Sequence, residues 1–324
     1  MSNNVIVLVG IVLFMVFFLL INLYFKLAVK FNIIDAPNLR SSHRELTIRG
    51  GAIIFPISIL LYEILFHFPD LHFLIGLLLL SVVCFWDDMK DISTQVRFLS
   101  QIVAVVLLLM SLGVENIWFL VAIFPIIIGF INGYNFMDGI NGITGLYSVV
   151  ILVSLFLVNI EVVLFVKNEF FLFLFIPLIV FLFYNFRKKA KCFAGDIGSI
   201  TIAFTLSFLF LLLIKQTEKF IYLLFVSVYG IDILATIIER LWLKQNIFKP
   251  HRMHLYQLFA NEGKWSHLKV ATIYSTIQLL INFIVISLVN FSSDVQLLAA
   301  ILIVVPLLIS YISLKQKYKS LVLS

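Results

Sequence analysis

Two neighbouring carboxylates are the first feature of the sequence that could do chemistry. Asp87 and Asp88 follow directly on a long apolar segment. Adjacent carboxylates at the end of an apolar helix repel each other and are poorly solvated, so they stay ionised only beside a cation. An oxygen-only ligand set suits Mg²⁺, and Mn²⁺ shares this preference. A solvated helix end, neutralised by Lys90, is the alternative that this pair alone leaves open.

Amide and carboxylate side chains recur along a second polar stretch. Asn132, Asn135 and Asp138 are spaced three residues apart, so on a helical turn they would share one face. The stretch is rich in glycine, which lets a ligand approach the backbone closely, and it holds no Lys or Arg. We expect these side chains to line a ligand site, although a Gly/Asn turn between two helices would have the same composition.

A third acidic position lies at the predicted start of another helix. Asp196 is flanked by Gly195 and Gly198. Glycine-rich helix starts expose backbone N–H groups that can bind phosphate. An acid at this position is equally typical of ordinary helix capping, so both interpretations stay open.

Imidazole and guanidinium groups cluster in two further polar stretches. Both groups suit an anionic diphosphate, and Arg can bind it through two parallel hydrogen bonds. A solvated basic loop at an anionic membrane surface is the alternative. Carboxylates that hold a metal ion, together with cations that hold phosphates, predict phosphoryl transfer. The basic candidates are Arg40, His43, His251, Arg252 and His254.

The composition decides what kind of scaffold positions these residues. Of the 324 residues, 62% are hydrophobic and 12% are charged. Soluble proteins are about 45–50% apolar and about 25% charged, so this chain lacks the polar surface of a soluble protein. We predict an all-α, polytopic integral membrane protein in the lipid bilayer, with a single transmembrane domain over residues 1–324.

The apolar segments predict eleven transmembrane helices, since a span needs roughly 20 mostly apolar residues. Charges, prolines, glycines and asparagines mark their ends. The predicted spans are 5–25, 52–68, 71–86, 98–114, 117–131, 146–166, 169–186, 198–214, 219–240, 270–290 and 295–314.

The distribution of Lys and Arg predicts the orientation. Twenty of the 23 basic residues flank the same side of these spans, and only Lys167, Lys215 and Lys219 lie on the other. Basic residues accumulate on the cytoplasmic side, so we expect the N-terminus outside, the C-terminus inside and all the polar stretches at the cytoplasmic face. Topology thus explains the net charge of +6, and we predict no nucleic-acid partner.

In their order and residue types, these motifs resemble the polyprenyl-phosphate N-acetylhexosamine-1-phosphate transferases, of the glycosyltransferase family 4 type. That family includes phospho-MurNAc-pentapeptide translocase and enzymes that initiate O-antigen synthesis. The resemblance runs from Pro37-Asn38-Leu39-Arg40-Ser41-Ser42-His43 to His251-Arg252-Met253-His254-Leu255-Tyr256-Gln257. The final motif is closer to the O-antigen branch. Asn141 departs from the pattern, because many relatives have Asp there.

The resemblance implies a Mg²⁺-dependent enzyme of the bacterial inner membrane, with its active site on the cytoplasmic face. Such an enzyme transfers N-acetylhexosamine-1-phosphate from a UDP-N-acetylhexosamine to undecaprenyl phosphate. It releases UMP and forms the first lipid-linked sugar of a cell-envelope polysaccharide.

The resemblance also implies a role for each matching residue. Asp87, Asp88 and His254 would be catalytic, and Asp196 and Asp138 would hold the metal ion. The substrate-binding residues would be Arg40, His43, Asn132, Asn135, Asp138, His251 and Arg252.

Several alternatives stay open at this point. A transporter or flippase for a lipid-linked sugar would share the span count and the phosphate-binding groups. Within the transferase interpretation, attack could be direct or pass through a phosphorylated Asp87. The identity of the amino sugar and the existence of a homodimer are also left undecided by the residues.

Overall fold

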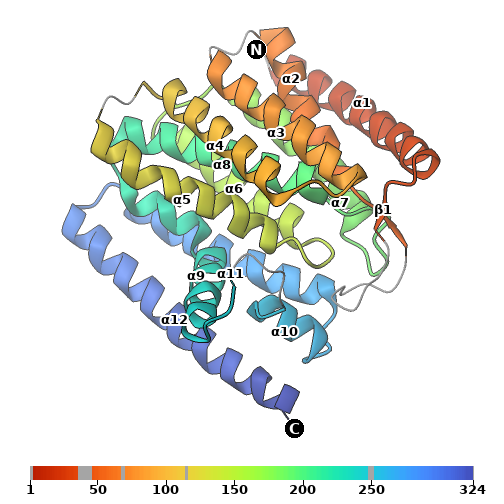
Figure 1. The fold of residues 1–324 in the computed structure, drawn as a ribbon. Helices are drawn as coiled ribbons and strands as arrows, with labels where there is room; N and C mark the ends of the chain where they lie inside the picture. The colour runs from red at the N-terminus through yellow and green to blue at the C-terminus, as the bar shows by residue number, and fades with distance from the viewer. Residues whose placement is uncertain (1–2, 36–45, 67–69, 114–115, 247–251, 324) are drawn as a thin grey trace.

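Long apolar helices make up most of the fold (Figure 1). The computed structural model describes residues 3–35, 46–66, 70–113, 116–246 and 252–323. Within them, ten helices are long and apolar enough to cross a membrane, and the apolar helix over residues 51–66 is shorter. The prediction of an all-α, polytopic membrane protein is confirmed, and the eleven predicted spans correspond to these ten helices and the shorter one.

The elements follow one another with short connections. The first half contains α1 (Asn3–Lys30), β1 (Ile34–Asp35), β2 (Thr47–Ile48), η1 (Gly51–Ile53), α2 (Ile54–Phe66), α3 (Leu71–Met89), α4 (Thr94–Ser111), α5 (Ile117–Phe136) and α6 (Ile143–Glu161). The second half contains α7 (Asn168–Asn185), α8 (Gly195–Thr217), η2 (Phe220–Val226), α9 (Ser227–Trp242), α10 (Leu255–Asn261), α11 (His267–Leu288) and α12 (Ser293–Leu323). The two strands form a small antiparallel pair.

Helix α8 is the centre of the fold. It is buried along almost its whole length and packs against α2, α3 and α5. Its sequence is apolar on every side, which is typical of a helix enclosed by other helices. Its hydroxyl side chains bond to the helix backbone, as when Thr205 Oγ1 donates to the carbonyl of Thr201 at 2.8 Å. The first turn of α8, which carries Asp196, is therefore held at a fixed depth by packing on three sides.

Three helices extend further at their polar ends than the sequence predicted. Helix α3 continues to Met89, α4 begins at Thr94, and α5 continues to Phe136. The side chain of Ser93 caps α4 by accepting a hydrogen bond from the Val96 N–H. Polar residues predicted in loops therefore lie on helical turns, which fixes the directions of their side chains.

The ninth predicted span is broken rather than continuous. It starts as the 3₁₀-helix η2 and changes to an α-helix at Ser227. Gln278 of α11 bonds to backbone on both sides of the change, accepting from Val228 N at 3.0 Å and donating to Leu224 O at 2.8 Å. A break inside a membrane requires such partners, because lipid cannot satisfy free backbone groups.

Two of the three lysines predicted to lie outside bind the ends of helices. Lys215 Nζ donates to the carbonyl of Leu112, the C-cap of α4. Lys219 Nζ donates to the carbonyl of Val289, the C-cap of α11, at 2.7 Å. Cations at helix C-termini satisfy carbonyls that have no partner within the helix. These two exceptions to the charge distribution thus have a structural explanation.

The predicted orientation can be tested with single cysteines at the two ends of α7, because both native cysteines are buried. Lys167 and Lys189 flank this helix and are both exposed. We expect Lys167→Cys to react with a membrane-impermeant maleimide in intact cells, and Lys189→Cys to react only after permeabilisation. The reverse labelling pattern would place the polar helix ends outside the cell.

Candidate functional site

Four helix ends meet around the guanidinium of Arg97. Arg97 lies in the first turn of α4, and its Nη1 is 2.8 Å from Oδ2 of Asp87 at the end of α3. Its Nη2 is 2.9 Å from Oδ2 of Asp196 at the start of α8. Asn135, in the last turn of α5, donates from Nδ2 to the other oxygen of Asp196 at 3.0 Å. The structure therefore brings three of the predicted acidic and amide residues to one end of the helix bundle.

Sequence reasoning missed Arg97. The sequence places it only among the basic residues of the predicted cytoplasmic side, since it follows the acidic pair in a short polar segment. The available signal was position: one Arg in the first turn of a helix that directly follows two carboxylates. The ion pair between Arg97 and Asp196 could not be predicted, because the two residues are far apart in the sequence.

Asp88 has a clear structural role. Its two carboxylate oxygens accept the backbone N–H groups of Asp196 and Ile197, at 3.0 and 3.1 Å. The side chain thus caps α8 from a neighbouring helix. Gly195 makes this approach feasible, because a Cβ there would lie 2.4 Å from Asp88 Oδ2. The catalytic role that the resemblance implies for Asp88 stays a prediction.

Asn135, Asp138 and Asp196 line a polar cavity of about 250 Å³. Asn135 also donates to Ser199 Oγ at 2.8 Å, which fixes its amide beside the carboxylate. Burial raises the pKa of Asp138 to about 7, and the charge of Asp196 contributes to the increase. Other polar residues around this cavity are Asp35, Arg49, Asn141, Asn185, Gln257 and His267.

The donor set of this polar cavity fits Mg²⁺ only together with a phosphate ligand. Asp138 and Asp196 supply two carboxylates. Among the described residues, no group of three or more His, Cys, Asp or Glu side chains could hold a metal ion by itself. Mg²⁺ in phosphate-transferring sites typically takes one or two carboxylates and completes its shell with water and substrate phosphates. Two acids beside an open polar space match that pattern.

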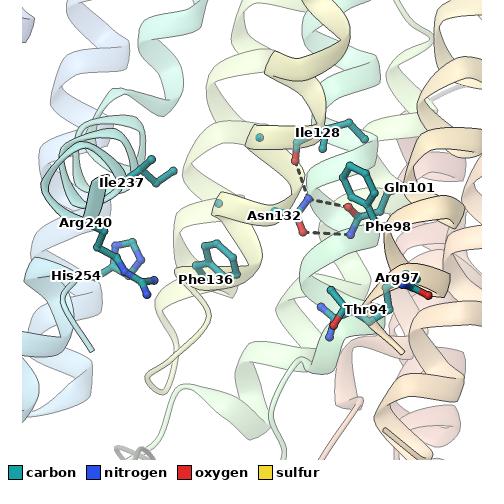
Figure 2. A pocket seen from close by; sticks show the side chains of 13 residues that line it. Thr94, Arg97, Phe98, Gln101, Ile128, Asn132, Phe136, Ile237, Arg240 and His254 are labelled. Carbon is teal, nitrogen blue, oxygen red and sulfur yellow. Dashed lines mark hydrogen bonds between the residues drawn. The ribbon is translucent and has the colours of Figure 1, made fainter. Parts of the chain in front are cut away.

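Asn132 faces a different cavity from Asn135, although both lie on α5. Its amide pairs with Gln101 of α4, donating from Nδ2 to Oε1 at 2.7 Å. Figure 2 shows this pair on one wall of a mostly apolar groove of about 390 Å³ between α4, α5 and α9. The prediction that the two asparagines face the same site is therefore wrong. Their side chains leave α5 in different directions, so Asn132 lines the apolar groove and Asn135 lines the polar cavity.

His254 lies on the opposite wall of the same apolar groove, near Arg240 (Figure 2). It is 2% exposed, and its Nδ1 is 3.0 Å from Oδ1 of Asp232. Asp232 is the intramembrane acid of α9, and it also accepts the N–H of Leu255 at 3.1 Å. The buried charge of Asp232 thus has partners, as the cost of an unpaired charge in a membrane requires.

Of the remaining basic candidates, Arg252 alone lies within the described residues. Arg40, His43 and His251 lie outside the described residues. Arg252 is described and partly exposed, but it lines neither the polar cavity nor the apolar groove. In its place the structure brings Arg49, Arg97 and Arg240 to the two cavities.

The capping role of Asp88 predicts a loss of stability in Asp88→Asn. Asparagine retains one acceptor oxygen and presents an NH₂ donor to the second backbone N–H of α8. We expect the free energy of unfolding to fall by about 1–2 kcal/mol, seen as a lower Tm in detergent. Asp91→Asn, an exposed acid three residues later, is the control and should leave the Tm unchanged. Equal Tm values for both variants would contradict the cap.

Known proteins are similar to this chain over most of its length. Residues 71–214 match the family model described as glycosyl transferase family 4. A probable undecaprenyl-phosphate N-acetylglucosaminyl 1-phosphate transferase of Bacillus subtilis is 28% identical over 278 residues, covering 77% of this chain and 75% of the relative. An undecaprenyl-phosphate alpha-N-acetylglucosaminyl 1-phosphate transferase of Thermotoga maritima is 27% identical over 260 residues, covering 76% and 80%.

A third relative matches a shorter stretch. Phospho-N-acetylmuramoyl-pentapeptide-transferase of Carboxydothermus hydrogenoformans is 31% identical over 174 residues, covering 52% of this chain and 51% of the relative. The segment matched by the family model contains Asp87, Arg97, Asn135 and Asp196, the residues that meet at the four helix ends. Over residues 71–214 the chain is thus similar to glycosyl transferase family 4, and over about three quarters of its length it is similar to the two N-acetylglucosaminyl 1-phosphate transferases.

Proposed function

We propose that this protein transfers N-acetylhexosamine-1-phosphate from a UDP-N-acetylhexosamine to undecaprenyl phosphate. The names of the relatives support the acceptor lipid and the type of enzyme. The observation that carries the proposal is the position of Arg97, which lines the apolar groove and is paired with Asp196 of the polar cavity. A lipid phosphate and a nucleotide diphosphate could thus meet at one guanidinium.

The apolar groove suits the lipid substrate. Its lining combines apolar side chains such as Phe98, Phe136 and Ile237 with the cationic or imidazole groups of Arg97, Arg240 and His254. An isoprenoid chain would lie against the apolar surface, and its phosphate would lie among the nitrogen-bearing groups. Guanidinium groups bind phosphate oxygens through two parallel hydrogen bonds.

The polar cavity suits the diphosphate of the sugar nucleotide. Asp138 and Asp196 would hold Mg²⁺, for which Mn²⁺ could substitute. When bound, the metal ion supplies charge stabilisation on the diphosphate oxygens. Asn135 donates a 3.0 Å hydrogen bond to Asp196, which would orient the carboxylate for the metal ion before the substrates bind.

The reaction exchanges one phosphorus–oxygen bond for another. A phosphate oxygen of undecaprenyl phosphate bonds to the β-phosphorus of the UDP-sugar, while the bond from that phosphorus to the bridging oxygen breaks and UMP leaves. Arg97 lies where negative charge gathers, and its ion pair with Asp87 fixes its orientation. Asp87 is itself fixed by the N–H of Ile92 at 2.9 Å. Catalysis then consists mainly of positioning and charge stabilisation.

We place this reaction at the cytoplasmic face of a bacterial inner membrane. The four helix ends that build the site lie on the side that is predicted to hold twenty of the 23 basic residues, which favours the cytoplasmic face. Soluble UDP-sugars would reach the polar cavity from that side. A transporter typically places its polar groups near the middle of the bilayer, whereas Arg97, Asp87, Asn135 and Asp196 all lie at helix ends.

The first test is release of UMP by the purified protein. We expect UMP only when undecaprenyl phosphate, Mg²⁺ and a UDP-N-acetylhexosamine are all present, and we expect EDTA to abolish it. A panel of UDP-sugars with and without the acetamido group would identify the donor. Movement of a lipid-linked sugar across proteoliposomes without UMP release would instead support the transporter interpretation.

The second test separates Arg97 from other basic residues. Arg97→Lys keeps the charge but cannot contact Asp87 and Asp196 through two separate nitrogens, so we expect kcat to fall about 100-fold. Arg187→Lys, at an exposed Arg following α7, is the matched control and should retain activity. Normal turnover in purified Arg97→Lys would remove this residue from the proposed mechanism.

A further inference from the structure

A buried ladder of polar side chains joins the C-terminal helix α12 to α9. Asp232, Thr236 and Glu239 lie on successive turns of α9, and Tyr311 and Lys315 lie one turn apart on α12. Lys315 is 5% exposed and Tyr311 is 6% exposed. Neither residue lines the polar cavity or the apolar groove, so direct contact with a ligand does not explain their burial.

Lys315 donates to three oxygen atoms. Its Nζ is 2.7 Å from the Tyr311 hydroxyl, 2.9 Å from Thr236 Oγ1 and 2.8 Å from Glu239 Oε2. An ammonium group has three donors and no acceptor. Both hydroxyl oxygens therefore accept from Lys315, and each must direct its own hydrogen elsewhere.

The carboxylate of Asp232 accepts hydrogen bonds from these hydroxyl groups. Its Oδ1 is 3.3 Å from the Tyr311 hydroxyl and 3.4 Å from Thr236 Oγ1. The two hydroxyls are also 2.8 Å apart, so one could donate to the other, but the second would still keep its hydrogen for Asp232. Tyr274 donates to Oδ2 at 2.8 Å. Because hydroxyl groups donate to both of its oxygens, the Asp232 carboxylate can act only as a hydrogen-bond acceptor here.

Oδ1 of Asp232 also contacts Nδ1 of His254, at 3.0 Å. An acceptor on that side requires the ring to carry a proton on Nδ1, and in the neutral ring the lone pair is then on Nε2. We propose that Lys315 and Tyr311 are positioning residues, which set the direction of these hydrogen bonds and thereby keep the proton of His254 on Nδ1.

The consequence for the reaction rests on the proposed function. His254 lines the groove assigned to the lipid phosphate, and a histidine with its lone pair on Nε2 can accept a hydrogen bond from a phosphate that still carries a proton. Mutation of a partner that fixes the tautomer of a metal-ligating histidine typically lowers affinity or activity about 10- to 100-fold, and we expect an effect of similar size for His254. Helix α12 would thus act on the site without touching a substrate.

The proposal is tested by measuring the tautomer of His254. ¹⁵N NMR of ¹⁵N-histidine-labelled protein in detergent, at about pH 7.5 so that free histidines are mostly neutral while lysines stay charged, would report which nitrogen carries the proton. The signal of His254 is assigned by its loss in His254→Gln. We expect a proton on Nδ1 in the native protein and in Lys317→Met, an exposed lysine on the same helix. We expect a mixture of tautomers in Lys315→Met.

Tyr311→Phe provides a second, milder variant in case Lys315→Met does not fold, and it should also shift the tautomer. In the UMP assay, both variants should lower kcat about 10- to 100-fold with little change in either KM, since neither residue binds a substrate. An unprotonated Nδ1 in the native protein, or a tautomer that is unchanged in the folded variants, would overturn the inference. A tautomer shift in a protein that transfers no sugar phosphate would overturn only the proposed function.

Discussion

The ion pairs of one guanidinium with two carboxylates are the interaction on which the rest of this site depends. Asp87 and Asp196 come from helices α3 and α8, and burial would make two unpaired carboxylates repel each other. Arg97 offsets that repulsion with separate nitrogens at 2.8 and 2.9 Å. Because the planar guanidinium fixes both directions at once, α3, α4 and α8 are held in one arrangement, and the polar cavity lies directly beside it.

Two buried carboxylates accept hydrogen bonds from backbone N–H groups at the starts of helices. Asp88 accepts two N–H groups at the start of α8, and Asp232 accepts the N–H of Leu255 at the start of α10. Helix starts leave N–H groups without partners, and a membrane offers no water to replace them. Each of these acids therefore stabilises the fold while it brings a site residue, Asp196 or His254, to its place.

The two cavities explain how one protein could bring together substrates of opposite polarity. The apolar groove and the polar cavity share the region around Arg97, with Asn132 facing the first and Asn135 facing the second. Donor and acceptor phosphates would then approach from different sides, and the guanidinium between them would limit their mutual repulsion.

The sequence by itself determined the class of fold and the number of apolar helices, and it singled out several of the polar residues that line the two cavities. These follow from local properties, because the length of an apolar segment and the charge of its flanks decide whether it spans a bilayer. The tertiary structure decided which way each side chain faces. The prominence of Arg97, the cap made by Asp88, the separation of Asn132 from Asn135 and the partners of Asp232 all depend on how helices distant in the chain extend and rotate against one another. That rotation is set by packing around α8, which no single segment encodes.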